Sequence, residues 1–115
     1  MSTANTDDKI FKALADGRRR QILDLLKNKP MITGEICSEF AGLNRCTVMQ
    51  HLGVLEKADL IIVKREGRVR WNYLNHLPIK EIYDRWMKSY TDVAVDFLSD
   101  IKSELESNRL TIRKE

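Results

Sequence analysis

The stretch from residue 33 to residue 58 constrains the fold most, because it predicts two short helices joined by a tight turn. Apolar residues recur at helical spacing in its first half, and Thr33 is placed to cap the first helix. Gly42 suits the end of that helix, since glycine adopts a left-handed backbone conformation at little cost. Asn44 is a strong N-cap for a second helix that begins at Arg45.

The second helix of this pair leaves its first turn exposed. Val48, Leu52 and Leu55 form its buried stripe, together with Val54. The side chains off the stripe include polar and cationic groups that can bond base edges or phosphates, and the major groove admits a helix that enters by its N-terminal residues. A solvated face in a helical hairpin would show the same pattern. The residues that we expect to face a duplex are Arg45, Cys46, Thr47, Met49, Gln50 and His51.

These side chains suit different parts of a duplex. Arg45 and Gln50 can make bidentate contacts to guanine and adenine, respectively, and Met49 can touch a thymine methyl. Thr47 suits either a phosphate or a base. His51 suits either a phosphate contact or packing between helices, so both interpretations stay open.

Length, composition and charge favour one globular, mainly helical domain over residues 1–115, since Gly and Pro are scarce among 115 residues. Residues 1–77 carry 13 basic and 9 acidic side chains, whereas residues 78–115 carry 7 and 8. The basic excess therefore accompanies the helix pair and suits a polyanionic partner. The longest apolar run, residues 60–63, is too short to cross a bilayer, and the first residues lack a hydrophobic signal, so we expect a cytoplasmic protein.

The two cysteines are too few for a disulfide framework. Cys37 falls on the apolar face of the first helix of the pair, where a small buried thiol is expected. Cys46 falls in the exposed first turn of the second helix, where the helix dipole would favour a reactive thiolate. The helical phases of the two residues argue against a bridge between them.

Two short helices are expected before residue 33. Residues 1–6 resemble a flexible polar arm, and a first helix follows from Asp7. Asp16 is a good N-cap for a second helix that runs to about Lys27. The arginines at positions 18–20 oppose the dipole of that helix, so we expect them to pair with a nearby carboxylate or to contact phosphate.

A β-hairpin is expected after the helix pair, because residues 60–65 and 68–74 are β-rich runs on either side of Glu66-Gly67. Val69, Trp71 and Tyr73 are predicted to face inward. The opposite face would be a basic wing along the phosphate backbone, although charges on such a hairpin can also serve only to protect its edges. The basic residues of the predicted wing are Lys64, Arg65, Arg68 and Arg70.

The last helix, predicted over residues 78–106, carries an apolar stripe for about seven turns, or roughly 40 Å. A stripe of this length predicts a subunit interface with the first helix as its neighbour, and the alternative is that it folds over its own core. Residues 107–115 are expected to fray. The predicted interface residues are Ile10, Phe11, Leu14, Tyr83, Trp86, Tyr90, Val93, Phe97 and Ile101.

The order of elements and three segments, residues 11–26, 47–60 and 65–68, resemble the ArsR/SmtB family of bacterial winged-helix transcriptional repressors. Gly17 stands where that family often has proline, and Asp59 where it often has glycine. The resemblance implies a winged helix-turn-helix with long dimerisation helices at both ends of the chain. It also implies a homodimer on an inverted repeat, with recognition helices about 34 Å apart.

The metal-sensing motifs of this family do not match the chain. Ile32 and Gly34 stand where some members have a Cys-x-Cys pair, and no histidine follows Pro78. We therefore expect no metal or cofactor, and no common small effector is implied.

The leading prediction is a sequence-specific DNA-binding repressor whose partners are double-stranded DNA and a second copy of the chain, with no membrane partner. One alternative is a winged-helix protein-interaction module that docks through the long helix. Another is a repressor switched by oxidation of Cys46. An enzyme is disfavoured, because His51 and His76 have no evident nucleophile as partner and no glycine-rich phosphate loop occurs.

Overall fold

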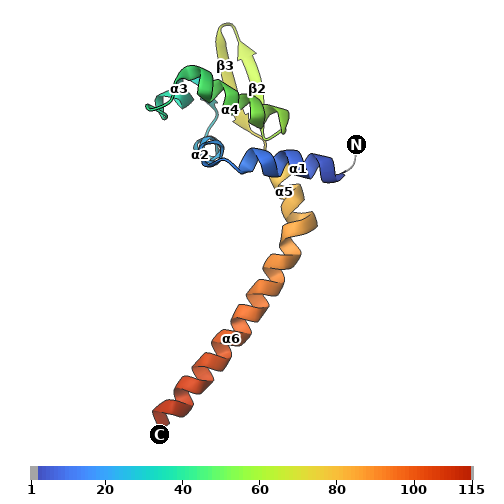
Figure 1. Ribbon diagram of the computed structural model, residues 1–115, viewed down its shortest axis with the longest axis vertical. Helices are drawn as coiled ribbons and strands as arrows, with labels where there is room; N and C mark the ends of the chain where they lie inside the picture. Colours follow the sequence, from blue (N-terminus) through green and yellow to red (C-terminus); the bar gives the residue numbers. More distant parts are fainter. Residues whose placement is uncertain (1–2, 115) are drawn as a thin grey trace. The chain divides into compact units, whose positions relative to one another are not determined.

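The computed structural model describes residues 3–114, with side chains described from residue 5 to residue 108. It confirms a mainly helical chain with a β-hairpin and a long last helix (Figure 1). The chain divides into two compact units, Met1–Ile79 and Lys80–Glu115. In chain order the elements are α1 (Thr3–Leu14), α2 (Gly17–Leu26), β1 (Met31–Ile32), α3 (Thr33–Ser38), α4 (Arg45–Lys57), β2 (Ile61–Glu66), β3 (Val69–Leu74), α5 (Leu77–Ile82), the π-helical segment η1 (Tyr83–Met87) and α6 (Lys88–Lys114).

Two of the predicted helix caps are confirmed. The Asn44 side chain accepts a hydrogen bond from the backbone N–H of Thr47 over 2.8 Å at the start of α4. The Asp16 side chain accepts one from the backbone N–H of Arg18, also over 2.8 Å, at the start of α2. Each side chain satisfies a donor that the first turn of a helix leaves unpaired, which fixes where that helix begins.

The predicted boundaries of α3 are wrong. Its N-cap is Ile32, without a side-chain hydrogen bond, and Thr33 is buried inside the helix start. The helix ends at Ser38, and Gly67 is the one glycine with a positive φ among the described residues, so Gly42 does not adopt the expected left-handed conformation.

The exit from α4 is a tight C-terminal turn around Asp59, whose φ is 60°. The backbone N–H groups of Asp59 and Leu60 donate to the carbonyls of Glu56 and Leu55, respectively, each over 3.0 Å. This is the Schellman arrangement, in which the residue with positive φ is usually glycine. Asp59 therefore adopts the conformation that explains why glycine is common there in the family that the sequence resembles.

The strands form one antiparallel sheet in the order β1-β3-β2. The pairing of Glu66 with Val69 leaves a two-residue turn at Gly67 and Arg68, and Gly67 has a φ of 62°. Glycine at the first central position suits the type II′ turn, whose twist matches a hairpin. The hairpin is confirmed, whereas the short strand β1 was not expected.

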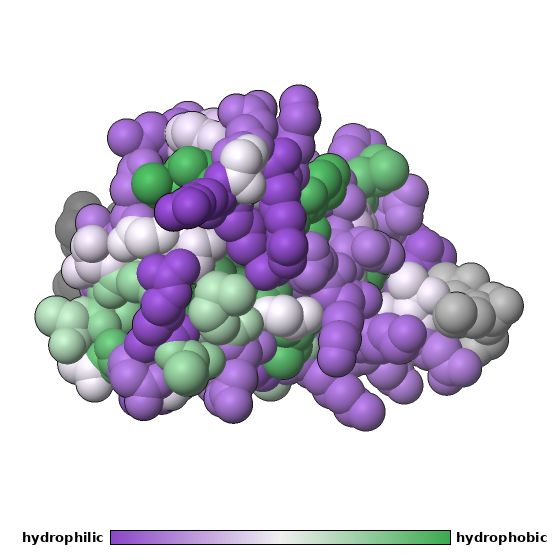
Figure 2. Space-filling model, turned by 90° about the horizontal axis from the view of Figure 1, so that it is seen from above, coloured by the Kyte–Doolittle hydropathy of each residue, from purple (hydrophilic) through white to green (hydrophobic). Residues whose placement is uncertain are grey.

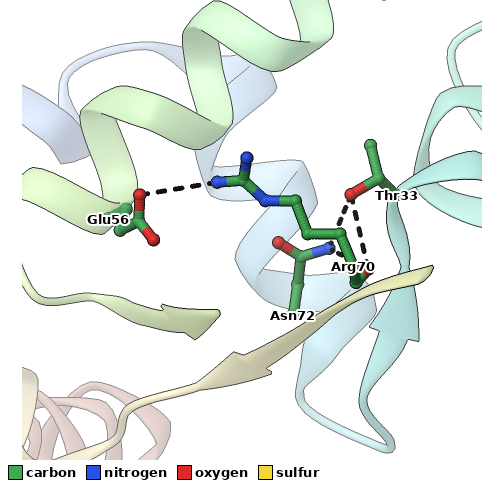
Figure 3. Close-up of polar contacts among 4 residues, drawn as sticks. All are labelled: Thr33, Glu56, Arg70 and Asn72. Carbon is green, nitrogen blue, oxygen red and sulfur yellow. Dashed lines mark hydrogen bonds and ion pairs between the residues drawn. The ribbon is translucent and has the colours of Figure 1, made fainter. Parts of the chain in front are cut away.

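The predicted inward face of β3 is wrong. Asn72 is completely buried, Trp71 and Tyr73 are half-buried, and Val69 is exposed. The amide of Asn72 donates to the Met31 carbonyl over 3.2 Å. It also donates to the hydroxyl oxygen of Thr33 over 3.1 Å (Figure 3). These partners replace the hydrogen bonds that the amide nitrogen would make to water, whereas the amide oxygen Oδ1 is buried without a hydrogen-bond partner among the described residues.

The core of the first unit lies between α2, α3, α4 and the sheet, and Ile10 and Ala13 of α1 also belong to it. Burial of each of its large aliphatic side chains contributes roughly 1.5–3 kcal/mol. The stripe predicted on α4 is confirmed for its three main members, but Val54 is 39% exposed. The largest fully buried side chains are Ile22, Ile36, Val48, Leu52, Leu55, Leu60, Ile61 and Asn72.

The helical backbone extends further at both ends than predicted. It begins at Thr3, so the expected arm of residues 1–6 is helical from its third residue, and residues 1 and 2 lie outside the described residues. At the other end α6 continues to Lys114 rather than ending at Ser107, and Glu115 lies outside the described residues. Within the described residues no helix has the length and apolarity needed to span a membrane.

Candidate nucleic-acid interface

The first turn of α4 presents an exposed polar surface. Arg45, Cys46 and Gln50 are exposed, as predicted, while Thr47 and Met49 are half-buried. The Thr47 hydroxyl donates to the Asn44 side chain over 3.1 Å, next to the backbone cap. Thr47 therefore helps to hold the turn in shape, and its exposed neighbours carry the chemistry that could meet a duplex.

His51 lies one turn further along α4 and is half-buried. Its Nδ1 atom is 3.4 Å from the Nη1 atom of Arg19, and its Nε2 atom is buried without a hydrogen-bond partner in the described residues. Both ring nitrogens face protein. Of the two interpretations left open by the sequence, the structure therefore favours packing between helices and not a phosphate contact.

The β2–β3 hairpin presents three of its four predicted basic side chains. Lys64, Arg65 and Arg68 are exposed close to the turn. Arg70 differs, because only 21% of its side chain is exposed and its Nη2 atom lies 3.4 Å from a carboxylate oxygen of Glu56 (Figure 3). The placement of Arg70 on a free basic face is therefore a wrong prediction: β3 turns this residue toward α4, to the same side as Asn72.

Arg19 and Arg20 of α2 donate to backbone carbonyls and not to the carboxylates that the sequence suggested. The Arg19 guanidinium donates to the carbonyls of Ala13 over 2.7 Å and Lys12 over 3.0 Å. Arg20 donates to the carbonyl of Leu14 over 2.5 Å. The last carbonyls of α1 have no partners within their own helix, so they attract these cations.

At the start of α2, the surroundings of Asp16 lower the pKa of its carboxyl group. The backbone N–H of Arg18 donates to its carboxylate and lowers the pKa of that carboxyl, and the positive charge of the nearby Arg19 acts in the same direction. The ionised form of Asp16 is thus the form that stabilises the α2 cap.

Both cysteines are free thiols. Cys46 is exposed at the start of α4, as predicted, whereas Cys37 is half-buried and not fully inside the core. Among the described residues, no group of three or more His, Cys, Asp or Glu side chains is arranged to hold a metal ion.

The predicted interface residues fall into three groups, which are buried, half-buried and exposed. Ile10 is only 3% exposed and belongs to the core of its own chain, so its assignment to an intersubunit surface is wrong. Val93, at 68%, is among the most exposed members of the stripe, and Leu14 and Ile101 are half-buried. Met87 and Leu98, which were not among the predicted residues, are exposed as well. The exposed members of the predicted set are Phe11, Tyr83, Trp86, Tyr90, Val93 and Phe97.

An exposed polar helix turn beside an exposed basic hairpin defines the class of winged helix-turn-helix DNA-binding proteins. Seen from above, the face toward which the hairpin points is mostly hydrophilic, with apolar residues scattered over it (Figure 2). The exposed cations Lys64, Arg65 and Arg68 of the hairpin suit a polyanionic partner.

Comparison with known proteins agrees with this class. A helix-turn-helix domain family matches residues 14–64. The transcriptional repressor SdpR of Bacillus subtilis is 33% identical over 81 residues, which cover 70% of this chain and 88% of SdpR. The HTH-type transcriptional regulator Rv2034 of Mycobacterium tuberculosis is 39% identical over 70 residues, or 61% of this chain and 64% of Rv2034.

Solved structures give the same result. The crystal structure of the ArsR family transcriptional regulator RHA00566 matches with a TM-score of 0.71 and 26% identity, covering 80% of this chain and 93% of that one. HlyU from Vibrio cholerae matches with a TM-score of 0.62 and 25% identity, covering 79% and 99%. The chain belongs to the ArsR/SmtB family of winged helix-turn-helix transcriptional regulators, so it is a DNA-binding regulator and not an enzyme.

Proposed function

We propose that this regulator is a sequence-specific repressor that binds an inverted-repeat operator as a homodimer. The observation that carries the proposal is the first turn of α4, which is capped by Asn44 and leaves Arg45 and Gln50 exposed. A helix that enters the major groove reads bases with its N-terminal side chains, and these two can form bidentate contacts to guanine and adenine.

The wing supplies the contacts that do not depend on sequence. Lys64, Arg65 and Arg68 are exposed cations that suit phosphate oxygens beside the groove. We leave Arg70 out of this set, because Glu56 already neutralises it. The wing would thus set the affinity for any duplex, while the first turn of α4 would set the preference among duplexes.

The proposal of a homodimer is supported by the apolar stripe on the last helical segment. Tyr90, Val93 and Phe97 are each more than 60% exposed in the single chain. Exposed apolar side chains in a row of this length are a mark of a subunit interface. An inverted-repeat operator would require the α4 helices of the two chains to lie about 34 Å apart, one turn of B-form DNA.

The repressor role is supported by the relative SdpR, which is named a transcriptional repressor. A repressor of this kind acts where the bacterial chromosome is, so we also propose a cytoplasmic location.

Titration over a salt series tests the proposal, with a duplex that the protein has selected from a random pool and a scrambled duplex of equal composition. The expected result is a preference of at least about 10³ for the selected duplex, and a strong fall of both affinities with salt. Equal affinity for the two duplexes would overturn the sequence-specific claim. Light scattering of the free protein should give the mass of two chains, and the mass of one would overturn the dimer.

A further inference from the structure

Arg19 joins three helices through one side chain. It lies on α2, it donates to the carbonyls of Lys12 and Ala13 in the last turn of α1, and its Nη1 atom is 3.4 Å from the Nδ1 atom of His51 on α4. The contacts with Ala13 and His51 are partly buried, whereas the contact with Lys12 is exposed to solvent. A planar guanidinium can direct donors at several acceptors at once, whereas the flexible ammonium of lysine cannot hold the same set.

The contact with His51 specifies one state of the imidazole ring. Arginine is always protonated and has no acceptor, so a hydrogen bond at this contact requires the lone pair on the Nδ1 atom of His51. The ring proton then resides on Nε2, which is buried and has no hydrogen-bond partner in the described residues. A ring with its proton on Nδ1 would place two donors against each other and would break the contact.

We propose that Arg19 is a positioning residue for α4, which fixes the rotation of the reading helix against the end of α1. This inference rests on the proposed function of α4. His51 directly follows Gln50 and lies one turn after Thr47, so holding its ring also holds the backbone that aims the first turn. The carbonyls of Lys12 and Ala13 follow Phe11, a predicted interface residue, so the same side chain connects the proposed dimer surface to the reading helix.

Arg20 provides a matched control for this role. It is the next residue on α2, carries the same charge, and donates to the carbonyl of Leu14 at the same end of α1. Within the part of the chain that the structure describes, this hydrogen bond ties Arg20 to α1 and not to α4. Arg19→Ala and Arg20→Ala therefore remove the same charge and both loosen the α1–α2 junction, but only Arg19→Ala releases His51.

The experiment compares Arg19→Ala, Arg19→Lys and Arg20→Ala at a temperature where thermal melts show all three folded. Affinity is measured for the selected duplex and for its scrambled counterpart. In Arg19→Ala and Arg19→Lys, the ratio of the affinities for the selected and scrambled duplexes should fall about tenfold. In Arg20→Ala, the affinities for both duplexes should fall alike, so that this ratio is unchanged. Long-range ¹H–¹⁵N NMR should show an unprotonated Nδ1 on His51 in the wild type and in Arg20→Ala, and a mixture of tautomers in Arg19→Ala.

Two results would overturn the inference while leaving the proposed function intact. One is equal preference in Arg19→Ala and Arg20→Ala, with the wild type still preferring its selected duplex. The other is a wild-type His51 whose proton is on Nδ1. A wild-type protein with no preference at all would instead refute the proposed function, and the positioning role with it, while the NMR spectra would still report on the Arg19 contact.

Discussion

Replacing Asn44 by alanine should weaken both the fold and the reading of DNA. The Asn44 side chain accepts hydrogen bonds from the backbone N–H of Thr47 at 2.8 Å and from its hydroxyl at 3.1 Å. Loss of such an N-cap costs about 1 kcal/mol, within a range of roughly 0.5–2 kcal/mol. For a chain of this length that cost lowers the Tm by about 4 °C.

The same loss should appear in DNA binding. Without its cap the first turn of α4 frays in the free protein, and ordering it again on the duplex consumes binding free energy. A cost of about 1 kcal/mol corresponds to a roughly fivefold weaker affinity for the selected duplex. The scrambled duplex, held mainly through phosphates by the wing, should lose less.

Thermal unfolding and duplex titration of Asn44→Ala and Asn44→Ser test this reasoning. Serine is also a good N-cap, so Asn44→Ser should restore most of the Tm and of the affinity. The reasoning is refuted if Asn44→Ala melts and binds like the wild type, or if Asn44→Ser loses as much as Asn44→Ala.

Three further substitutions separate the parts of the proposed interface. Gln50→Ala should relax preference at one operator position by about 1–3 kcal/mol, whereas Arg68→Ala should weaken all duplexes and reduce the salt slope by about one; the reverse pattern would exchange their roles. Because the pKa of Asp16 is lowered in the folded state, its carboxylate stabilises the fold at neutral pH, and this stabilisation fades as the pH falls below about 4. Asp16→Asn should therefore reduce the pH dependence of unfolding below about pH 4, and an unchanged pH dependence there would contradict this. Peroxide should weaken operator binding by oxidising Cys46, and a Cys46→Ser protein that responds like the wild type would exclude that switch.

The parts of the fold that the sequence predicted depend on local signals. Asn44 and Asp16 cap the helices that they were expected to cap, because each cap is formed within three residues along the chain. The hairpin was predicted for a similar reason, since a β-rich run on each side of a glycine is a short-range pattern. Asp59 stands where the family often has glycine, and its positive φ explains why glycine is common at this position.

The parts that the sequence did not predict depend on distant contacts. Asn72 is buried because β1, two residues long and without a detectable period, supplies the Met31 carbonyl from 41 residues away. That partner reverses which face of β3 points inward. The π-helical segment η1 interrupts the last helix without a signal that marks it in the sequence.

The candidate site was predicted in outline, because some of its features depend on local signals and others on distant contacts. Exposure of Arg45 and Gln50 follows from helical phase, so the sequence was sufficient for them. The partners of Arg19 and Arg70 follow from how α2 and β3 meet α4, which no short-range pattern encodes. The cluster of three arginines was the one available signal, because cations at a helix start need compensation.

Selection of bound duplexes from a random pool tests the central claim most directly, because the recovered sites report both sequence preference and symmetry. The account predicts enriched sites made of two inverted half-sites whose centres lie about 10 base pairs, or one duplex turn, apart. Recovery of no common sequence, or of a single half-site without its inverted copy, would contradict it.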